Sequence, residues 1–406
     1  MQLKEVTTPA DWKAFHQVPH YIYARDPHWI APLQGDVENV FNADKNKALE
    51  SGQAKQWVLY NDAGRAIGRI AAFIDARRNA QRDRREGGIG FFECVNDAAA
   101  ANRLFDEAEA FLLRAGMDTI HAPVNFGERD KFWGLLIKGW HPPLYHENYH
   151  PPYYRAFLDQ RGYLPMEQIF TFGGQVEDIA YQRLTTIADR VRERYHVQSR
   201  SIRINDLRGE GEYLAQVYNE AFASMPHFKP LEGVQLYKML KQLKPVMDPL
   251  LTCIAFADGK PVGFCALMPD INLSLKFAKG QLKWWKMPRF FFNLKMSKPK
   301  LVKGVAFGIH PEYQRKGVFS EMVDFLATVD DGANPKKYDA LGLATIRGGN
   351  YAMLNSAKAA LNVYVERVHL SFVKLFGDAV YEPYETSDVE DVAMGTVPDV
   401  SIYPTN

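Results

Sequence analysis

A short polar turn between an apolar run and a helical pattern carries the clearest chemical signal in the chain. The run Val305–Ile309 stops at His310-Pro311, and apolar residues recur with helical spacing from Val318 onward. We therefore predict a strand, a turn and a helix in that order. Unpaired backbone N–H groups and the positive dipole end at a helix start attract anions, so the turn predicts a site for a phosphorylated ligand. The alternative is an ordinary strand-to-helix turn with basic residues in solvent.

The same turn resembles a known cofactor loop. Its sequence Gln314-Arg315-Lys316-Gly317 is similar to the pyrophosphate loop of the GNAT superfamily of N-acetyltransferases. In that family Gln or Arg, two residues, Gly, one residue, and Gly or Ala follow the fourth strand. The last position is Phe319 here, which departs from the pattern. The resemblance implies that acetyl-CoA or another acyl-CoA is bound by Phe307, Gly308, Ile309, Gln314, Arg315, Lys316, Gly317, Val318, Phe319 and Ser320.

The resemblance also implies roles for residues further along the chain. Asn350-Tyr351-Ala352-Met353 is similar to the family's helix entry, where the Asn contacts the pantetheine arm, although Asn350 would serve equally well as a helix cap. Many family members place a tyrosine acid seven residues beyond that Asn, and this chain has Ala357 there. Tyr351 and Tyr364 are the candidate substitutes. The strand before the turn carries no carboxylate base, and the nearest acid is Glu312.

Length and composition bound the possible functions. A chain of 406 residues predicts two domains, and a formal net charge of +1 gives no reason to expect a nucleic-acid partner. No signal-peptide pattern follows Met1, and no apolar run is long enough to span a membrane, which leads us to expect a cytoplasmic protein. Cys94, Cys253 and Cys265 lie in apolar runs typical of buried reduced thiols, and the last two are expected to face each other across a hairpin. No metal site is predicted.

The chain repeats its own pattern at about half its length. Two hairpins, at 57–73 and 251–267, are each followed by an insertion, a strand, a helix, another strand and a further helix. We expect these later elements at 89–95, 98–113, 118–123 and 131–138 in the first half, and at 302–309, 318–329, 338–346 and 350–361 in the second. The predicted fold class is therefore α/β with a mixed sheet, and the whole chain resembles a double-GNAT arrangement.

The two halves differ where a cofactor would bind. Asn96-Asp97-Ala98-Ala99 gives the first half a helix cap without a glycine loop. We therefore expect a degenerate GNAT-like domain at 1–165, which packs on its partner and walls the acceptor pocket. A GNAT-like acyl-CoA-binding domain is expected at 166–378, with an acidic tail at 379–406. The segment 139–165 is rich in Pro and aromatic residues, and we interpret it as a proline-stiffened strand and linker. The alternative is a rigid wall of aromatic side chains at the junction of the two halves.

Residues 271–300 form an unusual insertion in the second half. They include seven Lys and one Arg, no acid, and interleaved Phe and Trp. A basic aromatic stretch of this kind suits an anionic lipid surface, nucleic acid or an acyl chain with an acidic head. A flap over a pocket with its lysines in water is the alternative. Gly280, Pro288 and Pro299 argue against one long surface helix, and only weak membrane-surface contact is expected.

These features lead to one main functional hypothesis. We predict an acyl-CoA-dependent N-acyltransferase, with acetyl-CoA as the expected donor and an amine of a small molecule or peptide as the acceptor. The alternative is a noncatalytic CoA-binding or scaffold protein on the same fold, suggested by Phe319, Ala357 and the missing base. A third hypothesis is an aminoacyl or lipid-linked transferase that uses the basic insertion to hold a large acceptor.

Overall fold

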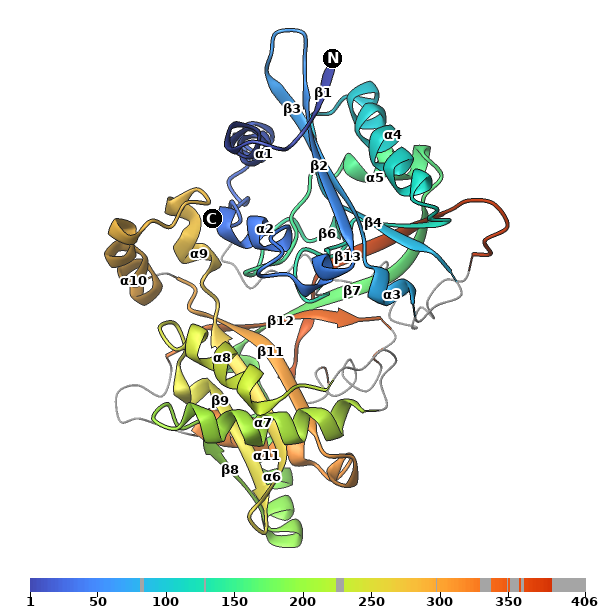
Figure 1. The fold of residues 1–406 in the computed structure, drawn as a ribbon. Helices are drawn as coiled ribbons and strands as arrows, with labels where there is room; N and C mark the ends of the chain where they lie inside the picture. The colour runs from blue at the N-terminus through green and yellow to red at the C-terminus, as the bar shows by residue number, and fades with distance from the viewer. Residues whose placement is uncertain are drawn as a thin grey trace.

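The computed structural model describes residues 1–406 except 81–83, 128, 224–229, 297, 329–336, 349, 351–357, 359–360 and 382–406. A single mixed sheet runs through the molecule, with helices packed on both of its faces (Figure 1). Most of the predicted acidic tail, from residue 382 on, and most of the predicted helix 350–361 lie outside the described residues. No helix in the described part of the chain is long and apolar enough to cross a membrane.

The two halves contain similar elements in a similar order. The first half comprises β1 (Gln2–Glu5), α1 (Pro9–Ile22), α2 (Gln34–Val40), β2 (Gln53–Tyr60), β3 (Ala66–Ile74), α3 (Ala76–Asn79), β4 (Glu86–Cys94), α4 (Ala98–Arg114), β5 (Thr119–Ala122), β6 (Leu135–Lys138) and α5 (Tyr154–Gln160). The remainder comprises β7 (Leu164–Gln175), α6 (Tyr181–Tyr195), β8 (Val197–Ser201), α7 (Leu207–Phe222), α8 (Gly233–Leu243), β9 (Thr252–Ala257), β10 (Lys260–Pro269), α9 (Asn272–Leu275), α10 (Met287–Met296), β11 (Leu301–Ile309), α11 (Val318–Thr328), β12 (Ala340–Arg347) and β13 (Tyr364–Leu375).

The order of strands displays the internal repeat. From one edge inward the sheet reads β1, β2, β3, β4, β5, and from the other edge inward it reads β8, β9, β10, β11, β12. In each half the hairpin and the next strand are antiparallel, whereas the fourth and fifth strands, β4 with β5 and β11 with β12, are parallel. The predicted tandem α/β arrangement is therefore confirmed.

The last strand of the second half crosses to the first half at the middle of the sheet. β13, at the end of the described chain, pairs with β5 of the first half, while β7 pairs with β12 of the second half. β7 and β13 also pair with each other, which makes the sheet continuous between the halves (Figure 1). The division near residue 165 remains our proposal for the repeated segments. β13, which belongs to the second segment, nevertheless completes the sheet of the first by pairing with β5.

Most predicted elements occur within a few residues of their expected bounds, and one has the wrong type. The segment 131–138 was expected to be helical, but Leu135–Lys138 forms β6 and pairs with β13. Gly134 and Gly139 bracket this strand with φ values of +78° and +83°, which ends it at both sides. Its short apolar run suits a strand as well as a helix, so periodicity alone could not decide. Cys253 and Cys265 are buried, free and directly opposite, as predicted.

The Pro- and aromatic-rich segment before β7 lies where the halves meet. The Tyr145 backbone N–H donates to the Asp270 carboxylate at 2.8 Å, and the Lys303 ammonium donates to the Tyr145 carbonyl. The guanidinium of fully buried Arg367 donates to Glu147 at 2.8 Å. These contacts join β11, β13 and the residue after β10 to the segment, so it packs between the halves and is more than a simple connection.

Candidate functional site

The two central strands of the second half part from each other after four paired residues. β11 and β12 pair only from Leu301–Gly304 to Ala340–Leu343, although β11 continues to Ile309 and remains paired with β10. Beyond this point β12 shifts its register against β7, with Thr345 at φ +58°. Val305, just past the last pair, is 53% exposed. One edge of β11 therefore faces an opening instead of a neighbouring strand, and its backbone groups are available to a ligand.

A tight loop follows the opened strand. The side-chain amide of Gln314 donates to the Ile309 carbonyl at 3.1 Å, which ties the loop to the end of β11. Arg315 and Gly317 have φ values of +60° and +89°. A Cβ on Gly317 would lie 2.8 Å from Ile187 Cγ2 and 3.0 Å from Val191 Cγ2 of α6. Glycine is thus required here both by the backbone conformation and by the close packing of α6.

The loop leads directly into the start of α11. Val318, Phe319 and Ser320 form its first turn, and their N–H groups have no carbonyl four residues earlier within the helix. Arg315 and Lys316 are exposed beside this turn, and the Lys316 ammonium lies 5.0 Å from the Tyr195 ring centroid. Amide donors, the helix dipole and two cations together make this end of α11 suitable for an anion.

The Phe319 ring points away from the outer side of the loop. It lies against Phe307 of β11, with ring centroids 5.1 Å apart, and it lines a pocket between α11 and the sheet. The departure from the family's Gly or Ala at this position therefore places an aromatic ring in the pocket wall. The backbone of the turn keeps the conformation set by Gly317.

The pocket under α11 is apolar and has a volume of about 220 Å³. Its wall is built from α11, β10, β11, β12 and the segment before β9, and it includes Leu251, Cys265, Leu267, Val302, Val305, Ala306, Val323, Leu326, Ala327, Leu341, Leu343 and Ile346. Because Val305, Ala306 and Phe307 belong to the parted section of β11, the pocket and the strand opening are continuous. The polar groups of the wall gather at Asp248, Lys337 and Tyr338.

These three polar residues form a compact cluster. Asp248 accepts hydrogen bonds from Lys337 Nζ at 2.7 Å and from the Tyr338 hydroxyl at 2.8 Å. Burial opposes ionisation of Asp248, but the hydrogen bonds from Lys337 and Tyr338 hold the pKa of its carboxyl below the ordinary value. Burial and the adjacent carboxylate raise the pKa of Tyr338. The pocket wall therefore carries a carboxylate and a neutral phenol at neutral pH.

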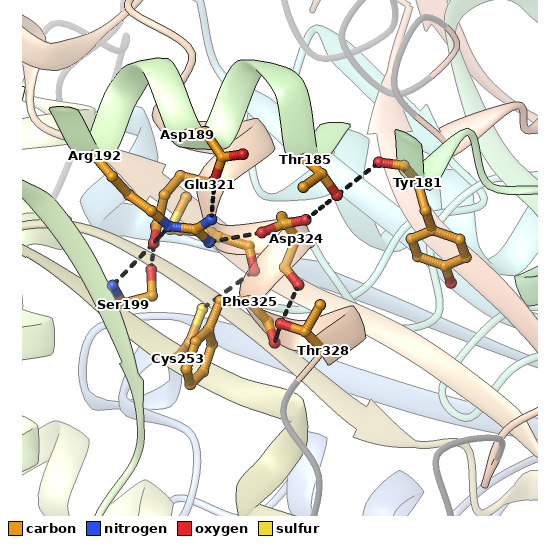
Figure 2. A network of polar contacts seen from close by, with 11 residues as sticks. Tyr181, Thr185, Asp189, Arg192, Ser199, Cys253, Glu321, Asp324, Phe325 and Thr328 are labelled. Atoms are coloured by element: carbon orange, nitrogen blue, oxygen red, sulfur yellow. Dashed lines mark hydrogen bonds and ion pairs between the residues drawn. The ribbon is translucent and has the colours of Figure 1, made fainter. Parts of the chain in front are cut away.

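A polar network fixes α11, and with it the loop, against α6 (Figure 2). Arg192 of α6 donates to Asp324 at 2.6 Å and lies 3.5 Å from Glu321, and Thr185 donates to Asp324 at 2.6 Å. Glu321 also accepts from the Ser199 backbone N–H at 3.1 Å. Both carboxylates are almost fully buried. Their need for donors makes the position of α11 relative to α6 specific.

Replacing Arg192 with methionine is expected to destabilise the protein. The change leaves the buried carboxylates of Asp324 and Glu321 without their cation, which should cost about 1–3 kcal/mol. Urea unfolding with an unchanged m-value measures the effect. Arg190→Met is the control because Arg190 is exposed on the same helix, and its cost should stay within about 0.5 kcal/mol. Equal stability of the two variants would show that the network does not hold α11.

The remaining predicted site residues lie apart from the pocket or outside the described chain. Asn350 follows β12 and donates its backbone N–H to the Arg347 carbonyl at 2.9 Å. Tyr351 is outside the described residues. Tyr364 packs with Leu144, Leu301 and Ala340, and its buried hydroxyl has no hydrogen-bond partner among the described residues. It does not line the pocket, so its role as an acid remains a prediction without a supporting contact.

The corresponding strand of the first half, β4, carries a buried carboxylate that is already hydrogen-bonded within the protein. Glu93 on β4 accepts from the hydroxyls of Tyr23 and Tyr154, both at 2.8 Å, and lies 3.6 Å from Arg69. Burial raises the pKa of Glu93. After β4 the chain enters α4 directly, and Asp97 accepts from the amides of Ala99 and Ala100. The Asp97 side chain therefore occupies the first turn of α4. The contacts of Glu93 lie within the core of the first half.

Two curated proteins are similar to this chain in amino-acid sequence. Protein YghO of Escherichia coli (strain K12) is 28% identical over 349 residues, which is 85% of this chain and 88% of that protein. A protein named bacterial ceramide synthase, from Caulobacter vibrioides (strain NA1000 / CB15N), is 26% identical over 315 residues, covering 76% of this chain and 80% of that protein. No protein-family model matches the chain.

Two solved structures are similar to this chain in fold. A tandem GNAT protein from the clavulanic acid biosynthesis pathway aligns with a TM-score of 0.52 and 9% identity, over 93% of this chain and all of that one. A GCN5-related glucosamine N-acetyltransferase region of a fungal multi-domain GH3 β-N-acetylglucosaminidase aligns with a TM-score of 0.53 and 11% identity, over 92% of this chain and 38% of that one. The chain therefore has the GNAT superfamily fold of GCN5-related N-acetyltransferases, with two such units in tandem.

Proposed function

We propose that this chain is an acyl-CoA-dependent N-acyltransferase whose second half binds the acyl donor. The parting of β11 from β12 carries the proposal, because it joins three features in one continuous site. These are an anion-binding turn at the start of α11, a free edge of β11 and an apolar pocket. They correspond to the three parts of an acyl-CoA, namely its diphosphate, its thioester arm and its acyl chain.

The residues at the site suit this chemistry. The amides of residues 318–320 with Arg315 and Lys316 would hold the diphosphate, and Gly317 would allow its close approach. Acyl-CoA, when bound, supplies an activated acyl group. A neutral amine attacks its thioester carbonyl, so that a C–N bond forms and the C–S bond breaks, and the proton lost by the amine leaves on the thiol of CoA. A backbone N–H of β11 near Phe307 would donate to the carbonyl oxygen as negative charge develops there. Binding both reactants in one closed site supplies much of the rate.

The pocket favours an acyl group longer than the acetyl group expected from the sequence. Cavities of about 150 Å³ lined by apolar side chains accept benzene, and this pocket is larger. The name of one relative points the same way, because a ceramide is an amide of a long-chain acyl group. We therefore propose a fatty acyl-CoA as donor, with the acceptor being an amine.

Calorimetry and thiol release test the proposal on the full chain. Titration with acetyl-CoA and decanoyl-CoA should show binding of both, with the longer chain bound more tightly because it buries apolar surface. Thiol release over a panel of amines, including long-chain amines, should then identify the acceptor class. Binding without release for any amine would favour the noncatalytic ligand-binding alternative. No binding of either ligand at millimolar concentration would reject the proposal.

A further inference from the structure

The segment 276–300 exposes aromatic and apolar side chains to an unusual degree. Four of the six exposed large aromatic residues in the described chain lie between 284 and 292, namely Trp284, Trp285, Phe291 and Phe292. Trp284 is 81% exposed, Phe292 is 64% exposed, and Met296 at the end of α10 is 60% exposed. Water disfavours apolar surface gathered in this way, which marks the segment as an interaction surface.

Basic residues surround the same surface. Lys279, Lys283, Arg289 and Lys295 are exposed, and the sequence 271–300 contains no acid. Lys283 lies 5.1 Å from the Trp285 ring centroid, and Arg289 lies 4.7 Å from the Phe277 ring centroid. Cations beside tryptophan and phenylalanine side chains are typical of helices that lie in the interface of an anionic bilayer.

The segment is attached to the body of the protein in a way that leaves this surface exposed to solvent. Phe290 is the fully buried residue of α10, while its neighbours Phe291 and Phe292 are exposed. Figure 1 shows α10 at the edge of the molecule, away from the central sheet. One aromatic residue thus fixes the helix to the body, and the others are presented to the surroundings.

A second pocket lies beneath α10, next to the pocket under α11. Phe291, Leu294 and Lys295 line it, together with Leu273 and Leu301. It shares Asp248, Leu250, Lys337 and Tyr338 with the pocket under α11. An apolar ligand entering beside α10 would therefore reach the Asp248 cluster, which also forms part of the wall of the pocket under α11.

We propose that the surface formed by Trp284, Trp285, Phe292 and Met296 docks on an anionic lipid bilayer. The surrounding lysines and arginine attract the anionic headgroups, and the aromatic rings enter the interface between headgroups and acyl chains. Docking places the pocket beneath α10 against the bilayer, where an apolar substrate can pass without crossing water. This last step rests on the proposed acyltransferase function, whereas bilayer binding itself does not.

Vesicle sedimentation of the full chain tests the docking surface. The wild-type protein should bind vesicles of phosphatidylglycerol and phosphatidylcholine, and bind pure phosphatidylcholine vesicles much more weakly. The triple variant Trp284→Ser/Trp285→Ser/Phe292→Ser should lose roughly tenfold or more in affinity. The charge variant Lys279→Glu/Lys283→Glu/Lys295→Glu should lose binding to the anionic vesicles specifically.

A matched control removes exposed apolar residues elsewhere. Val234→Ser/Met239→Ser changes two exposed side chains of α8, outside the docking surface, and should bind vesicles like the wild type. Blue-shifted tryptophan emission on vesicle addition should occur in the wild type and be lost in the triple variant, because Trp284 leaves water. Calorimetry of decanoyl-CoA with the triple variant should be unchanged, which separates failure of docking from failure of the acyltransferase proposal.

Three outcomes would overturn the inference. The first is equal vesicle binding by the wild type and the triple variant, or binding by neither. The second is a wild-type dimer that the triple substitution converts to a monomer without any vesicle binding, which would assign the surface to a second copy of the chain. The third is salt-sensitive binding to a single-stranded RNA oligonucleotide in place of vesicles, which would assign it to nucleic acid.

Discussion

Replacement of Gly317 with valine is expected to reduce acyl-CoA affinity by about a hundredfold. Gly317 has a φ of +89°, and a β-branched residue is strongly disfavoured in that region. The new side chain would also meet Ile187 and Val191 of α6 at 3.0 Å or less from its Cβ. The turn can accept it only by moving the first amides of α11 away from their present direction, and those amides are the proposed diphosphate donors. Isothermal titration with decanoyl-CoA measures the change.

A second glycine separates this effect from backbone strain alone. Gly259, in the turn between β9 and β10, has a φ of +78° and open space where a Cβ would lie. Gly259→Val should therefore carry the conformational cost, about 1–3 kcal/mol of stability, without a change in affinity. Equal loss of binding in both variants would point to general destabilisation. Wild-type affinity in folded Gly317→Val would show that the diphosphate is held elsewhere.

The sequence was sufficient to predict most of the local elements and the turn. Helix periodicity, the cap at Asp97 and the repeated hairpins depend on residues close together in the chain, and local patterns record such contacts well. The strand, loop and helix around Gly317 also follow from a contiguous stretch. The direction of the Phe319 ring could not be predicted in the same way, because it depends on packing against Phe307 on a neighbouring element.

Features built from residues far apart in the chain could not be predicted from the sequence alone. Asp248 meets Lys337 and Tyr338 about ninety positions away, and no spacing rule connects them. The pairing of β13 with β5 is another example, since an apolar strand can close either half equally well. The position at which β11 parts from β12, after Gly304, depends on where β10 and β12 shift register. Tertiary pairing thus set the details of the candidate site.

Filling the acyl pocket is expected to change which acyl-CoA the protein prefers. Ala327 lies on the last turn of α11 and contributes its small side chain to the pocket wall. Ala327→Trp would place an indole in the space that we propose for the acyl chain. Affinity for decanoyl-CoA should fall by about tenfold or more, because the chain loses its apolar contacts. Affinity for acetyl-CoA should stay within about threefold, since the start of α11 is about two and a half turns away and unchanged.

The neighbouring residue provides the control for added bulk. Thr328 is exposed and does not line the pocket, so Thr328→Trp adds the same side chain at the same helix end but directs it to solvent. Its preference between the two ligands should match the wild type. If Ala327→Trp loses both ligands equally, the pocket binds the common part of acyl-CoA instead of the acyl chain. If it loses neither while remaining folded, the acyl chain lies outside the pocket, and the assignment of a fatty acyl donor fails.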